Sequence, residues 1–236
     1  AGAAGMDGWT ADEAIAVATF CPSLIDELYD LLVRTMTDTE HGMSADIHEM
    51  IAPWRVVGVP KRDPTESRPI AIASVFLRAW HRSLGDSLPA LSTRQWSEAG
   101  VAKALTNWME FQGIAGSEID LAAAFDMIQH DVAQAALTHG GTPSAVVAWM
   151  RHTWSAPRYC HVKGTVAEAL WPSRGIPAGD PPSMRILGVV LEPWHGLIEQ
   201  YHPDLMTWAY ADDCSIAVDG RSTLSAKMAT ELVDEA

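Results

Sequence analysis

The feature that most constrains the fold is a pair of apolar runs separated by a short polar segment near the end of the chain. Leu205–Ala209 and Cys214–Val218 have the length and composition of strands, and Tyr210-Ala211-Asp212-Asp213 lies between them. Side chains alternate between the two faces of a strand, so neighbouring Asp residues within one strand could not share a ligand. At the tip of a hairpin they can converge. The segment therefore predicts a β-hairpin with two carboxylates at its turn.

Two interpretations of this turn are open from the segment alone. Asp is a preferred turn residue, so the pair can be an ordinary surface turn. Two close carboxylates also repel each other, and a bound divalent cation with oxygen ligands relieves that repulsion. The choice between them depends on the rest of the chain.

Composition narrows the class of protein. A length of 236 residues allows one large domain or two small ones with a buried core. No apolar stretch approaches the ~18 residues of a membrane span, and the N-terminus has no secretory signal. The three cysteines are odd in number and lack CxxC spacing, which indicates neither a disulfide framework nor a zinc site. We therefore expect an intracellular protein of the nucleus or cytoplasm without membrane partners. Because it begins without Met, we expect it to be part of a longer chain.

The charge distribution is more informative than the net charge of −14. Such an acidic total argues against nucleic-acid binding by the surface as a whole. Residues 55–103, however, carry eight Lys or Arg against four acidic residues, whereas residues 1–54 carry one against ten. One basic segment thus lies between acidic ones, and it contains Lys61, Arg62 and Arg68.

The pattern of apolar residues predicts mixed α and β elements. Strands and helices do not alternate regularly, which favours an α+β fold over a doubly wound sheet. Thr142 and Pro143 are suitable as N-cap and first residue of a helix, and Asp180 is suitable as an N-cap. The predicted helices are 11–18, 22–36, 70–84, 122–137, 143–154 and 180–201; the predicted strands are 56–59, 119–121, 159–162 and 165–170, besides the hairpin.

Four blocks then follow one another over roughly residues 55–220. They are Val59-Pro60-Lys61 with Arg68-Pro69-Ile70, Asp120-Leu-Ala-Ala-Ala-Phe125-Asp126, Gly175-Ile-Pro-Ala-Gly179-Asp-Pro-Pro-Ser183, and Tyr210-Ala-Asp-Asp213. Each block alone is a weak signal. In this order and with these gaps they resemble a reverse transcriptase, most of all the enzymes of non-LTR (LINE-like) retrotransposons and group II introns.

The resemblance implies the fingers and palm of a right-hand polymerase, with an antiparallel palm sheet backed by helices and no thumb. Residues 55–118 and 139–178 would form the fingers, and residues 119–138 and 179–236 would form part of the palm. Residues 1–54 match no part of the family pattern, and we expect them to be a helical N-terminal extension that packs on the fingers.

The implied activity is RNA-directed DNA polymerisation by two-metal nucleotidyl transfer. Asp120, Asp212 and Asp213 would be catalytic and would bind two Mg²⁺, with Mn²⁺ as an alternative. The partners would be an RNA template, a DNA primer and deoxynucleoside triphosphates, in the service of a retrotransposon. Asp126 would instead cap or pair at the first turn of its helix.

The remaining site residues also follow from the resemblance. Lys61 and Arg68 would bind the triphosphate, Ala178 and Gly179 would adjoin the nucleotide, and Tyr210 would contact the primer or template. Phe125 would lie under the sugar and exclude a 2′-hydroxyl. From the residues alone, Phe125 can equally belong to a buried helix stripe with Ile128, Val132 and Ala135.

The chain departs from the family pattern at two positions, and alternative functions therefore stay open. The family commonly has an amide residue where this chain has Ala178, and Asp180 introduces an acid near a polyphosphate site. A catalytically degenerate, reverse-transcriptase-like nucleic-acid-binding module is therefore one alternative. An RNA-dependent RNA polymerase is the other, although such enzymes usually have Gly-Asp-Asp at the hairpin where this chain has Ala211-Asp212-Asp213.

Overall fold

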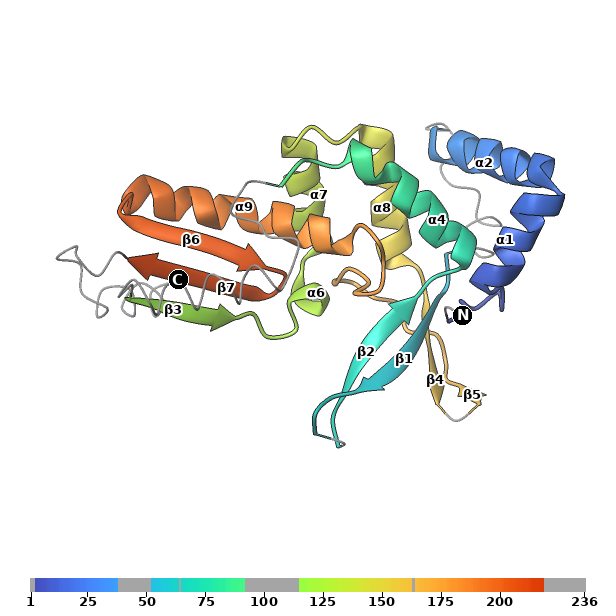
Figure 1. Cartoon of the computed structure of the whole chain (residues 1–236), viewed down its shortest axis with the longest axis horizontal. Helices are drawn as coiled ribbons and strands as arrows, with labels where there is room; N and C mark the ends of the chain where they lie inside the picture. Colours follow the sequence, from blue (N-terminus) through green and yellow to red (C-terminus); the bar gives the residue numbers. More distant parts are fainter. Residues whose placement is uncertain (1–2, 38–51, 64, 92–114, 163, 219–236) are drawn as a thin grey trace. The chain divides into compact units, whose positions relative to one another are not determined.

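The computed structural model describes residues 3–37, 52–63, 65–91, 115–162 and 164–218 (Figure 1). The chain forms two compact units. The first combines residues 1–89 with residues 125–184, and the second combines residues 90–124 with residues 185–236. Helices and short sheets occur in both, which confirms the α+β class. Among the described residues no helix is long and apolar enough to span a bilayer.

A four-stranded sheet organises the first unit. Its order is β2-β1-β4-β5, with β1 antiparallel to β2, parallel to β4, and β4 antiparallel to β5. The strands are β1 (Trp54–Pro60), β2 (Ser67–Ile72), β4 (Arg158–Val162) and β5 (Thr165–Val166). The hairpin predicted around Gly164 is confirmed, although its second strand ends at Val166 rather than at Leu170. The φ of +83° at Gly164 is one that glycine adopts without strain.

Helices of the first unit bury a tryptophan-rich core. Trp54, Trp149 and Trp154 are almost fully buried, and the indole N–H of Trp54 donates to the carbonyl of Thr153 at 2.9 Å. Truncating such a side chain typically costs about 3–5 kcal/mol of stability. The helices are α1 (Ala11–Phe20), α2 (Pro22–Thr37), α4 (Val75–Ser83), α7 (His130–His139) and α8 (Ser144–Ser155), with a 3-10 turn at Leu84–Ser87. In sequence, the division between the units falls within the short α6 (Ala124–Met127), after Ala124.

An antiparallel sheet backed by one helix forms the described part of the second unit. Its order is β3-β7-β6, with strands β3 (Ala115–Asp120), β6 (Leu205–Tyr210) and β7 (Asp213–Val218). Helix α9 (Ser183–Tyr201) packs Trp194 and Ile198 against Leu205 and Ile216 of the sheet. Figure 1 shows α9 running along this sheet.

Several predicted boundaries are wrong. Residues 70–72 belong to strand β2 rather than to a helix, because they pair with residues 55–57 of β1. The helix predicted over 122–137 is two helices, α6 and α7, interrupted where Gln129 bridges Arg174. Helix α8 begins at Ser144, one residue after the predicted start, and Thr142 is buried before it.

A close backbone contact fixes the segment before α9. A Cβ atom added to Gly179 would overlap the carbonyl oxygen of Ala71 in β2, so only glycine fits at this position. The segment also differs from prediction, because α9 begins at Ser183 rather than at Asp180.

We expect Gly179→Ala to lower the free energy of unfolding by about 1–3 kcal/mol, because backbone atoms cannot rotate away as a side chain could. Thermal and urea unfolding would measure the loss. The matched control is Gly196→Ala in α9, where an added Cβ meets nothing within 4 Å. It should raise stability by up to ~1 kcal/mol, the difference in helix propensity. Equal effects of the two substitutions would contradict the contact.

Candidate active site

The register of the second unit brings the predicted carboxylates to one end of its sheet. Asp120, the last residue of β3, pairs directly with Asp213, the first residue of β7. Asp212 occupies the two-residue turn between β6 and β7, and its carbonyl accepts the N–H of Leu121 at 3.1 Å. Although more than ninety positions separate Asp120 from the hairpin in sequence, the three residues lie together.

Alternation along the strands turns two of these residues away from the core. Ile119 and Cys214, which pair with each other, belong to the face against which α9 packs. Asp120 and Asp213 are the next residues along each strand, and both are exposed. Successive side chains point to opposite faces, so these two carboxylates share the face that α9 does not cover.

The turn that carries Asp212 has an unusual backbone. Ala211 has a φ of +55°, which is uncommon for a residue with a Cβ. A positive φ at the first turn residue matches the right-handed twist of a two-residue hairpin. The local strain is held by strand pairing on both sides, a situation found often at functional sites.

The described carboxylates do not form a ready-made metal cage. Among the residues that the structure describes, no three His, Cys, Asp or Glu side chains are close enough together to hold an ion. Mg²⁺ is commonly held by one or two carboxylates and completes its coordination with water and substrate phosphates. The facing Asp120 and Asp213, with Asp212 beside them, fit such a site, which substrate would help to complete.

The negative charges at the turn affect the pKa of the neighbouring Cys214 thiol. Burial, together with the negative charges of Asp213 and Asp212, raises the pKa of Cys214 to about 11. This thiol is therefore protonated at neutral pH and is not a nucleophile.

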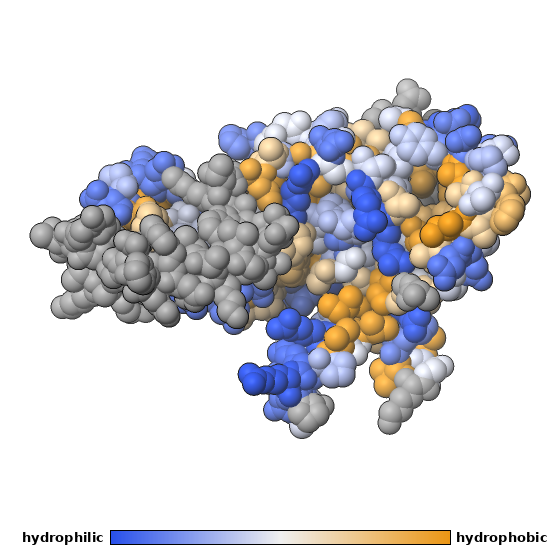
Figure 2. Space-filling view, viewed as in Figure 1, coloured by the Kyte–Doolittle hydropathy of each residue, from blue (hydrophilic) through white to orange (hydrophobic). Residues whose placement is uncertain are grey.

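In the first unit, a second group of predicted residues lies at the tip of the β1–β2 hairpin. Lys61 and Arg68 line the same surface hollow, together with Val59, Pro60, Arg62, Asp63 and Glu66. The tip is hydrophilic in Figure 2. Lys61 Nζ pairs with Glu66 Oε2 at 2.9 Å, and this hydrogen bond lowers the pKa of Glu66. A phosphate bound by Lys61 would compete with this exposed ion pair, which is weak in water.

Phe125 lies in α6 and is only partly buried. Its carbonyl accepts the N–H of Ile176 at 2.8 Å, so it is tied to the segment that leads to Ala178. The interpretation as a continuous buried stripe is wrong, because Val132 and Ala135 are exposed while Ile128 is buried.

The buried His130 and the partly buried Arg158 brace the same segment at Gly175. The carbonyl of Gly175 accepts from His130 Nε2 at 3.0 Å and from an Arg158 nitrogen at 2.9 Å. Burial lowers the pKa of His130, so its ring is neutral at neutral pH. Asp126 makes a long ion pair with Arg158 at 3.9 Å, in keeping with the pairing role expected of it.

The segment Pro177–Asp180 presents one residue to solvent. Ala178 is exposed, whereas Pro177 and Asp180 on either side are buried. Gly179 rests on Ala71 of β2, the strand that carries Arg68 at its other end. Backbone contacts therefore join three of the predicted nucleotide-binding elements within the first unit: α6, this segment and β2.

Tyr210 ends β6 and pairs with Asp213 in the strand register. It belongs with the three Asp residues to the second unit, whereas Lys61, Arg68, Phe125, Ala178 and Gly179 belong to the first. Each group is brought together within its own unit.

A buried polar network was not predicted from the sequence. His81 Nδ1 lies 2.7 Å from Asp180 Oδ1, and the indole N–H of Trp149 donates to His81 Nε2 at 2.9 Å. The three residues are far apart in the chain, so spacing offers no signal for it. Asp180 is therefore not the N-cap that we predicted.

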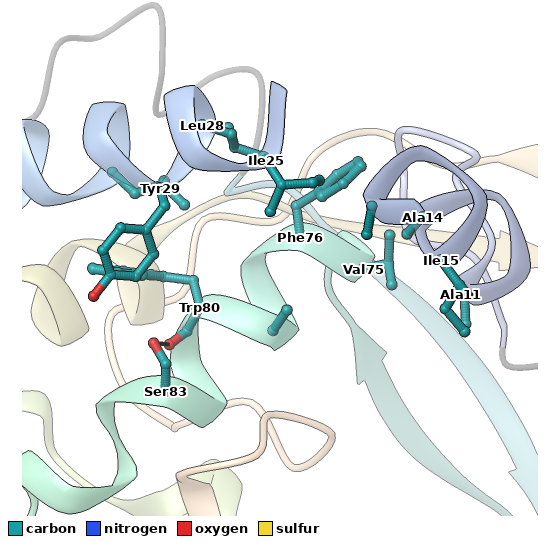
Figure 3. A pocket seen from close by; sticks show the side chains of 13 residues that line it. Ala11, Ala14, Ile15, Ile25, Leu28, Tyr29, Val75, Phe76, Trp80 and Ser83 are labelled. Atoms are coloured by element: carbon teal, nitrogen blue, oxygen red, sulfur yellow. Dashed lines mark hydrogen bonds between the residues drawn. The ribbon is translucent and has the colours of Figure 1, made fainter. Parts of the chain in front are cut away.

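An apolar groove lies between α1, α2 and α4 (Figure 3). Its volume is about 360 Å³, and its lining includes Ile15, Leu28, Tyr29, Phe76 and Trp80. The groove offers no charged group for a phosphate, so it does not suit a nucleotide. It does show that the N-terminal helices pack on α4, where Tyr29 stacks edge-on against Trp80.

Comparisons with known proteins identify the family to which the chain belongs. The sequence pattern of the family described as reverse transcriptase (RNA-dependent DNA polymerase) matches residues 59–234. The chain belongs to this family, whose members are nucleotidyltransferases. No curated protein matches it closely enough to be called a relative.

Two similar solved structures are telomerases from Candida tropicalis. Apo telomerase, truncated from the C-terminal domain, gives a TM-score of 0.51 at 11% identity and covers 75% of this chain and 45% of that one. Telomerase in complex with a TWJ fragment of telomeric RNA gives 0.54 at 9% identity and covers 78% and 38%. The chain thus spans less than half of either telomerase, and at these identities the likeness establishes the fold alone.

Proposed function

We propose that the chain is the nucleotide-adding part of an RNA-directed DNA polymerase of a retroelement, of the non-LTR or group II intron type. The observation that carries this proposal is the pairing of Asp120 with Asp213 beside Asp212 in a chain of the reverse transcriptase family. The four sequence blocks support the retroelement type.

In this proposal Asp120, Asp212 and Asp213 hold two Mg²⁺. The ions would supply charge stabilisation at the attacking and leaving oxygens of an in-line displacement. Asp120 and Asp213 would contribute ligands from the sheet face that α9 does not cover, and Asp212 would contribute ligands from the adjoining turn. The primer 3′-hydroxyl would lose its proton and attack the α-phosphorus, and pyrophosphate would leave.

Lys61 and Arg68 would bind the triphosphate. Both line one hollow on an exposed hairpin, and together they offer a compact ammonium and a planar guanidinium fork. Phe125, Ala178 and Gly179 would form the sugar and base side of the nucleotide site, and Tyr210 would contact the primer or template. Backbone contacts connect Phe125, Ala178 and Gly179 within the first unit, which supports assigning them to one side of the nucleotide site.

A second candidate function is a catalytically degenerate module that binds nucleic acid without extending it. The observation that favours it is Ala178, which offers no side-chain hydrogen bond at an exposed position of the predicted site. Primer extension by the intact gene product separates the two. RNA and DNA templates are tested with deoxynucleotides and ribonucleotides, and extension on RNA with deoxynucleotides is expected.

We expect Asp212→Asn to reduce extension below detection while leaving the unfolding temperature within a few degrees of wild type. The substitution removes a ligand charge at nearly constant shape, so the metal site cannot assemble. Glu118→Gln is the matched control, because Glu118 is an exposed carboxylate on the same strand as Asp120, two residues earlier. Normal extension by Asp212→Asn would refute the assignment.

We expect Arg68→Ala to raise the KM for nucleotide and to slow the chemical step, because the lost contacts are to phosphate oxygens. Steady-state and single-turnover extension would measure both effects. Arg34→Ala, at an exposed arginine of α2, should change neither. If Arg68→Ala weakened only template-primer binding, its assignment to the triphosphate would be wrong.

We expect Phe125→Ala to increase ribonucleotide use relative to deoxyribonucleotide use by tenfold or more. A loss of ~1.4 kcal/mol of discrimination is already tenfold, and removing a steric clash can supply more. The ratio of kcat/KM for the two sugars is measured together with the melting temperature. A core role would instead cost about 3–5 kcal/mol of stability and leave sugar preference unchanged.

A further inference from the structure

The network of His81, Asp180 and Trp149 lies in the interior of the first unit. The side chains of His81 and Asp180 are both 0% exposed, and Trp149 is 2% exposed. They come from α4, from the segment before α9, and from α8. Only 2.7 Å separates His81 Nδ1 from Asp180 Oδ1, so the contact is a short hydrogen bond.

Trp149 determines which ring nitrogen of His81 carries the hydrogen. An indole N–H can only donate, so His81 Nε2 must accept the 2.9 Å bond. Nδ1 then carries the hydrogen and donates to Asp180.

Asp180 in turn anchors the tight turn that precedes it. Its N–H donates to the carbonyl of Pro177 at 3.0 Å, and Ser183 Oγ donates to the same carbonyl at 2.7 Å. The turn is thus held by His81 on one side and, through Gly179, by the backbone of Ala71 on the other.

A buried acid is a poor choice if stability alone were at stake. Replacing a buried ionic or polar pair with apolar side chains of similar volume is often neutral or stabilising. Asp180 Oδ2 has no hydrogen-bond partner among the described residues, so the network does not recover the full cost of burial. A directional hydrogen bond fixes the orientation of the groups that it joins, whereas an apolar contact does not.

We propose that His81 and Asp180 are positioning residues that fix the Pro177–Gly179 turn, and through this turn set the affinity for the incoming nucleotide. The inference rests on the proposed function for the role of Ala178 and Gly179. Neither His81 nor Asp180 touches substrate in this proposal. They hold the exposed Ala178 and its backbone in place against β2, the strand of Arg68.

The decisive variant replaces the whole network with apolar side chains: His81→Leu, Trp149→Phe and Asp180→Leu together. It leaves no charge or donor of the network unpaired, but Trp149→Phe removes part of a buried side chain, so we expect a folded protein with a lowered unfolding temperature. Amide hydrogen exchange at Asp180 and Ser183 should accelerate, because their N–H groups belong to the turn. The KM for deoxynucleotide should rise about tenfold, with kcat and template-primer affinity nearly unchanged.

The matched control is His81→Gln. Its amide can accept from Trp149 and donate to Asp180, so exchange and KM should stay at wild-type values. A folded triple variant with unchanged exchange would overturn the positioning role. Faster amide exchange at Asp180 and Ser183 with an unchanged KM for deoxynucleotide would overturn the link between the turn and nucleotide affinity. Wild-type protein that extends no primer would overturn the proposed function instead, while the exchange rates would still decide whether the network holds the turn.

Discussion

The constraint on which the candidate site depends is the register of the β3-β7-β6 sheet. Because side chains alternate with a period of two, a slip of one residue would turn Asp120 towards α9 and expose Ile119. The apolar face under α9 penalises such a slip, so the burial of Ile119, Cys214 and Ile216 fixes the position of the carboxylates. The packing that buries these apolar side chains therefore also sets the geometry of the candidate site. The two-residue turn adds the second constraint, since a longer loop would separate Asp212 from Leu121.

The hairpin was predictable because all of its determinants are local. Two apolar runs of strand length flank a short polar turn, and neither run is long enough to favour a helix. The pairing with Asp120 was not derivable from spacing and came from the family resemblance. Residues 70–72 were wrongly predicted as helical, because a short apolar run fits either structure and its strand partner, β1, lies in another part of the sequence. Likewise, Gln129 breaks the predicted helix through a bridge to Arg174, which is a tertiary interaction.

Asp180 is the clearest example of a residue whose structural role could not be predicted from the sequence. Its position before a helix gave a sound local reason to predict an N-cap. The structure gives it a partner 99 residues away and buries it, and the helix begins three residues later. A buried acid has no local signature in sequence, because the donor that makes burial tolerable comes from another element. The same applies to Gly179, whose need for glycine arises from the carbonyl of Ala71.

The acidic net charge finally bears on how such a chain could bind polyanions. With −14 overall, long-range attraction of nucleic acid is not available from the net charge of the chain, so any binding must be local. The β1–β2 tip concentrates Lys61, Arg62 and Arg68, yet Asp63 and Glu66 lie in the same hollow. Glu66 pairs with Lys61, and a triphosphate carries more charge than one carboxylate. A polyphosphate, whose charges lie close together, would therefore displace Glu66 from Lys61 more readily than the separate phosphates of a nucleic-acid backbone. The hollow thus suits a nucleotide better than a template strand.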